Sequence, residues 1–115
     1  QIDSPNMDVN LNGLWGGLLV LGKAPISAAG GAEAVQIEGI PASDNNGLYG
    51  GTVANDNSGE LSYISIRHGG ANIGEGNEIN GLTLGGVGNA TKVENIEIVS
   101  NQDDGLEIFG GTVNV

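Results

Sequence analysis

The densest group of chemically active side chains in this sequence is acidic and lies near its end. Asp103 and Asp104 are adjacent, and Glu107 follows three residues after Asp104. Carboxylates grouped in this way bind Ca²⁺, which prefers oxygen ligands, or share a proton in acid–base catalysis. We therefore take Asp103, Asp104 and Glu107 as a candidate Ca²⁺ site. A solvated Asp-Asp-Gly turn, in which the carboxylates cap backbone N–H groups, is the alternative and the favoured interpretation.

Other reactive groups are scarce. The chain has no Cys, which excludes disulfides, thiolate zinc sites and Cys nucleophiles. His68 is the single histidine, so it has no second His at metal-ligand spacing, and we expect it to be a turn residue beside Gly69 and Gly70. No other cofactor is predicted, and Ca²⁺ remains the one candidate.

The net charge restricts the partners. Three Lys and Arg residues stand against 14 Asp and Glu residues, which gives 3 − 14 = −11. A field of this sign repels the phosphates of nucleic acids and the head groups of anionic lipids. The longest apolar stretch, Leu18–Leu21, is also far too short to cross a bilayer. We expect no nucleic-acid partner and no membrane insertion.

Short strands are the elements predicted to position these groups. The pattern apolar-x-x-apolar-x-apolar occurs in three clear copies, and alternation with period two points apolar side chains to one face. Gly-Gly pairs begin at positions 16, 30, 50, 69, 85 and 110, and Asn- and Asp-rich turns separate the strands. The three copies are Leu61/Ile64/Ile66, Ile79/Leu82/Leu84 and Val93/Ile96/Ile98.

A repeat near 20 residues built from short strands predicts an all-β fold, a right-handed parallel β-helix (β-solenoid) of about five coils. One domain would span residues 1–115 and form part of, or a building block for, a longer solenoid. Residues 1–12 would form a leading segment and residues 22–47 an irregular insertion. An antiparallel sandwich or barrel is the alternative, since its strands also recur every few residues.

The alternating apolar residues should line a narrow interior. In the repeat register Leu61 matches Val93, so Arg67 and His68 should lie near the strand end that precedes Asp103. Trp15, Tyr49 and Phe109 each precede a Gly-Gly pair, which favours packing at a coil corner over a sugar-stacking platform. The predicted interior residues are Leu18, Val20, Ile64, Ile66, Leu82, Leu84, Ile96, Ile98, Leu106 and Ile108.

Ordered blocks over nearly the whole chain resemble the secreted parallel β-helix proteins of Bacteroidetes and some marine bacteria. The resemblance implies an extracellular or cell-surface location, a longer parent chain and no settled activity. It is carried by Gly13–Ile26, Ile37–Pro41, Gly59–Gly70, Asn77–Gly88 and Asp103–Asn114.

Two functions follow as expectations. The first is a non-enzymatic extracellular structural or adhesive solenoid, which self-associates head-to-tail through its open ends into a filament. The second is a carbohydrate-active enzyme or carbohydrate-binding module on the same scaffold, with a glycan as its partner. A lyase would need a base from Lys23, Arg67 or Lys92, and hydrolases of this architecture combine Asp residues with a His and basic residues.

Overall fold

The computed structural model describes residues 8–74 and 76–115, and its regular structure consists of strands and two short 3₁₀ turns. No helix in this described part is long and apolar enough to cross a membrane. The strands are β1 (Leu18–Leu21), β2 (Val35–Gln36), β3 (Leu48–Tyr49), β4 (Glu60–Arg67), β5 (Asn72–Gly74), β6 (Asn77–Glu78), β7 (Leu82–Gly85), β8 (Lys92–Val99) and β9 (Leu106–Phe109); the 3₁₀ turns are η1 (Ala29–Gly31) and η2 (Asn45–Gly47).

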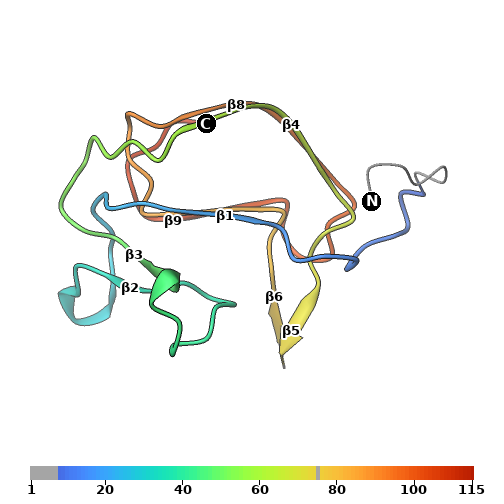
Figure 1. Cartoon of the computed structure of the whole chain (residues 1–115), viewed down its shortest axis with the longest axis horizontal. Coiled ribbons are helices and arrows are strands. Elements are labelled where there is room, and N and C mark those ends of the chain that lie inside the picture. Colours follow the sequence, from blue (N-terminus) through green and yellow to red (C-terminus); the bar gives the residue numbers. More distant parts are fainter. Residues whose placement is uncertain (1–7, 75) are drawn as a thin grey trace.

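Two parallel sheets form the coil. One has the strand order β1-β7-β9 and the other pairs β4 with β8. Figure 1 looks along the direction in which strands stack, so β4 overlies β8, and β1 and β9 overlap in the view although β7 lies between them. Leu61 pairs with Val93 and Ile64 with Ile96, which confirms the parallel pairing and the register expected from the repeats.

The number of windings is smaller than predicted. The longest stack among the described residues has three strands, not five. Equivalent positions lie 82 − 18 = 64, 106 − 82 = 24 and 92 − 60 = 32 residues apart, so a uniform repeat near 20 residues is wrong. Some Gly-Gly pairs occur in segments that leave the coil, and the spacing of such pairs therefore does not count windings.

Two antiparallel hairpins leave the coil on the same side (Figure 1). β2 pairs with β3, and β5 pairs with β6. The first hairpin belongs to a long excursion between β1 and β4. The stretch expected to be an irregular insertion, residues 22–47, contains β2 and both 3₁₀ turns, but the strand that completes its hairpin follows it at Leu48–Tyr49.

The core is a thin aliphatic column between the two parallel sheets. Leu82 and Leu84 on the middle strand β7 are fully buried. Burial of such side chains stabilises the fold by about 1.5–3 kcal/mol each relative to exposure. The cluster consists of Leu61, Ile66, Leu82, Leu84, Val87 and Val93, with Leu18, Val20, Ile64, Ile96, Ile98 and Val113 partly buried against it.

Leu106 and Ile108 depart from the predicted interior. They are in register with Leu82 and Leu84, yet 38% and 47% of their surfaces are exposed. β9 is an edge strand of its sheet, and no described strand packs on its outer side. The alternation therefore predicted the direction of these side chains correctly, but their burial requires a further winding.

Candidate functional site

The predicted acidic cluster lies in the turn between β8 and β9. Asp103 and Asp104 are exposed, whereas Glu107 on β9 is half-buried. The Asp104 carbonyl oxygen accepts a hydrogen bond from the Gly81 N–H at 2.9 Å, and a Glu107 carboxylate oxygen accepts one from the Asn80 amide at 2.6 Å. Glu107 therefore contacts the turn that precedes β7, the middle strand of its sheet.

The structure does not bring these carboxylates together around one point. Within residues 8–74 and 76–115, no group of three His, Cys, Asp or Glu side chains is arranged to hold a metal ion. Calcium binding by Asp103, Asp104 and Glu107 stays a prediction. Thermal unfolding with and without Ca²⁺ tests it: a specific site would raise the Tm, and Asp103→Asn would remove that rise.

Arg67 lies where the register placed it, opposite Val99, and the His68 N–H donates to the Val99 carbonyl oxygen at 3.0 Å. The Arg67 guanidinium is bound to the Glu97 carboxylate at 2.8 Å, and Ser65 donates to the same carboxylate at 2.6 Å. This network joins β4 to β8 on the outer face of the sheet. It lowers the pKa of Glu97, first through the Ser65 hydrogen bond and then through Arg67.

Lys92 is held in a similar way. Its ammonium group lies 2.9 Å from the Glu60 carboxylate and 3.1 Å from that of Glu94. The two hydrogen bonds raise the pKa of Lys92, with the contribution from Glu60 the larger. Exposed ion pairs of this kind contribute little to the stability of the fold, but they engage the Lys92 ammonium group.

His68 forms a buried corner. Its backbone is left-handed, with φ 60°, and Ser100 at the equivalent position of the next winding has φ 56°. The imidazole Nδ1 lies 2.7 Å from the Leu11 carbonyl oxygen. The expectation of a turn residue is confirmed. The segment carrying Asp103 runs alongside, since the Gln102 N–H donates to the Gly69 carbonyl oxygen at 3.1 Å, yet the imidazole is turned to Leu11.

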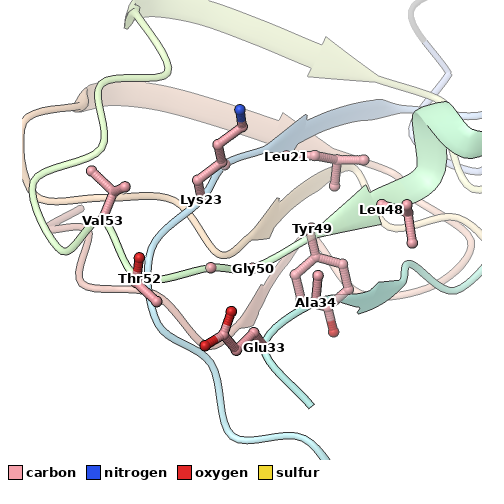
Figure 2. Close-up of a pocket in the computed structure, with 11 residues that line it drawn as sticks. Leu21, Lys23, Glu33, Ala34, Leu48, Tyr49, Gly50, Thr52 and Val53 are labelled. Carbon is pink, nitrogen blue, oxygen red and sulfur yellow. The ribbon is translucent and has the colours of Figure 1, made fainter.

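A pocket of about 380 Å³ lies where the excursion meets the coil, as Figure 2 shows. Sequence reasoning did not find it. Its walls come from the end of β1, from residues 33–34 and from residues 48–53, so sequence-distant segments form it. Lys23, Glu33 and Tyr49 are its ionisable lining residues.

Tyr49 links this pocket to the coil. Its ring and that of Phe109 have centroids 6.2 Å apart and are tilted by 60°. Burial raises the pKa of the Tyr49 hydroxyl, and the charge of Glu107 adds to the rise, so the hydroxyl stays protonated at neutral pH. Trp15 lies elsewhere and donates through Nε1 to the Arg67 carbonyl oxygen at 2.7 Å. The sequence Tyr49-Gly-Gly-Thr-Val recurs as Phe109-Gly-Gly-Thr-Val, a repeat from which the contact of the two rings was not predicted.

Residues 4–115 match the family described as "Pectate-lyase like beta helix domain". The chain belongs to this family. As a pectate-lyase-like β-helix domain, it has the parallel strand pairs and the aliphatic column expected from its repeats. The resemblance to a parallel β-helix family is thus confirmed. No curated protein and no solved structure matches the chain.

Proposed function

We propose that this pectate-lyase-like β-helix domain is a non-catalytic structural module at the cell exterior, and that its β9 end binds a further winding. Leu106 and Ile108 carry this proposal: each is in register with a fully buried leucine, yet remains 38% or 47% exposed. Covering apolar surface is worth about 25 cal/mol per Å². The same strand also presents unpaired backbone groups, which favour pairing with another strand.

The state of two of the three candidate bases supports a non-catalytic role. Arg67 and Lys92 are each held by carboxylates, whereas Lys23 forms no ion pair within the described residues. His68 is buried against the carbonyl oxygen of Leu11. A catalytic base needs access to the proton that it removes. Arg67 and Lys92 instead connect β4 with β8 through Glu97 and Glu60, and the His68 imidazole contacts the leading segment at Leu11.

The proposed partner of β9 is a second copy of the chain. β1 is the opposite edge strand of the same sheet, and it pairs with β7 in the parallel register that β9 also uses. Leu18 and Val20 would then cover Leu106 and Ile108. A contact that joins opposite ends does not close, so repetition gives a filament. Where a chain continues past Val115, its own next winding would cover the same edge.

Sedimentation velocity over a range of concentrations, with electron microscopy of the same samples, tests this proposal. The 115-residue chain should associate as its concentration rises, and L106D with I108D should remain monomeric. V53D is the matched control, since Val53 is 43% exposed but lies in the excursion, and it should associate like wild type. A wild-type chain that stays monomeric throughout would refute the proposal.

The family match favours one other candidate, a polysaccharide lyase or hydrolase or a glycan-binding module. It predicts release of unsaturated products or reducing sugars from a polysaccharide panel that includes polyuronates. Asp103→Ala should abolish that release, and Glu38→Ala, another exposed carboxylate, should not. No release and no binding across the panel would leave the structural role.

A further inference from the structure

We propose that Glu107 limits self-association through β9, because a second copy stacked on this edge places an apolar side chain over its carboxylate. The inference rests on the proposed head-to-tail association and adds the residue that controls its strength. It also indicates which strand fits this edge best, namely one that carries a hydrogen-bond donor opposite Glu107.

The register of the sheet defines what would lie next to Glu107. Leu19 on β1 pairs with Thr83 on β7, and Thr83 pairs with Glu107 on β9, so the three residues form one row across the sheet. In the same register, the β1 strand of a second copy would place its own Leu19 beside Glu107. The two strands would be about 4.8 Å apart, which brings the two side chains into contact.

Thr83 shows the state of a side chain in this row that has a strand on each side. It lies between β1 and β9 and is only 3% exposed, although alternation places it on the face opposite to Leu82 and Leu84. Glu107 has a neighbouring strand only on the β7 side and is half-buried. A second copy on β9 would therefore bury its carboxylate further.

Few groups would stabilise the Glu107 carboxylate in that position. Asn80, itself 6% exposed, donates to one carboxylate oxygen at 2.6 Å. No ion pair among the described residues involves Glu107. The β1 strand of the second copy would add no side-chain donor, because Leu18–Leu21 is entirely aliphatic. Burial of a charge without further partners is costly, and charges on edge strands limit pairing with other chains for this reason.

The two faces of β9 therefore have opposite effects on association. On the inner face, covering Leu106 and Ile108 favours the contact, since both side chains are substantially exposed. On the outer face, desolvation of Glu107 opposes the contact. The association should consequently be weaker than the apolar area of the edge alone would give.

Sedimentation velocity of wild type, E107Q and E38Q at one pH and ionic strength tests the inference. E107Q removes the charge but keeps an acceptor for Asn80, and it should lower the dissociation constant about ten-fold. E107T, which introduces the residue type of the buried Thr83, should also strengthen association. E38Q is the matched control, since it removes the same charge from an exposed position in the excursion and should associate like wild type. This control separates local desolvation from the general repulsion between chains of net charge −11.

A substitution on the opposite edge tests the register. L19N supplies an amide donor to Glu107 of the neighbouring copy, whereas within one copy β7 separates the two positions. L19N should therefore favour association more in the chain with Glu107 than in E107Q. Equal effects of L19N in both chains would contradict the placement of these residues opposite each other.

The outcomes distinguish this inference from the proposed association. If wild type associates and neither E107Q nor E107T associates more tightly, the restraint by Glu107 is overturned and the association stands. If wild type stays monomeric while E107Q associates at the same concentrations, the restraint is supported and the association of the natural chain is refuted. If wild type, E107Q and E107T all stay monomeric, both are overturned.

Discussion

Tyr63 and Asn95 occupy equivalent positions of the paired strands β4 and β8, and both have left-handed backbone, with φ 55° and 54°. The pairing continues on both sides of them, from Leu61 with Val93 to Ile64 with Ile96. Asn tolerates this conformation well, whereas an aromatic residue is strained in it. Tyr63 is also 83% exposed, so little burial offsets the strain.

Tyr63→Asn should therefore stabilise the domain, by about 1 kcal/mol. The reverse change at the equivalent position, Asn95→Tyr, should destabilise it by a similar amount. Chemical unfolding measures both. Ser62→Asn serves as the control. Ser62 is next to Tyr63 but pairs regularly with Glu94, so this change should not stabilise the domain. A loss of stability in Tyr63→Asn would contradict the account of this corner.

Leu84→Ala and Ile108→Ala should differ strongly although the two residues are paired in register. Leu84 is fully buried, so its truncation should cost about 2–5 kcal/mol. Ile108 is nearly half exposed, and its truncation should cost less than half as much under conditions where the chain is monomeric. Equal costs would mean that β9 is already covered.

Asp56→Ala should weaken the attachment of the excursion to the coil. One carboxylate oxygen of Asp56 accepts from the Lys23 N–H at 3.1 Å, and the other accepts from the Ser58 hydroxyl at 2.7 Å and the Gly88 N–H at 3.3 Å. Loss of these bonds should cost about 1.5–3 kcal/mol in unfolding experiments. Asn55→Ala, an exposed neighbour, should change stability by less than about 0.5 kcal/mol.

Glu97 should titrate below its ordinary pKa of 4.5 in the folded chain. Because folding lowers this pKa, the stability that Glu97 contributes is present above the unfolded value and is lost as the pH falls through the folded value. NMR titration should place the pKa of Glu97 higher in Ser65→Ala than in wild type. An unchanged pKa in that variant would show that Ser65 does not stabilise the carboxylate.

Alternation predicted the buried faces of the strands, and the repeated motifs predicted their register, but an antiparallel sandwich stayed open until the structure showed the strands to be parallel. Ile64 and Ile96 illustrate this local signal. The pocket was not predictable, because only the path of the excursion brings residues 33–34 and 48–53 to the end of β1. Exposure of Leu106 was missed for a related reason: a sequence pattern gives the direction of a side chain, and burial depends on what packs above it.

Backbone and side-chain nuclear Overhauser contacts between β4 and β8 test the central claim most directly, namely that successive windings stack parallel and in register. We predict contacts between Ile64 and Ile96 and between Ile66 and Ile98, so that both strands advance in the same direction. Contacts that connect Ile64 with Ile98 and Ile66 with Ile96 would indicate antiparallel strands and would contradict the β-helix.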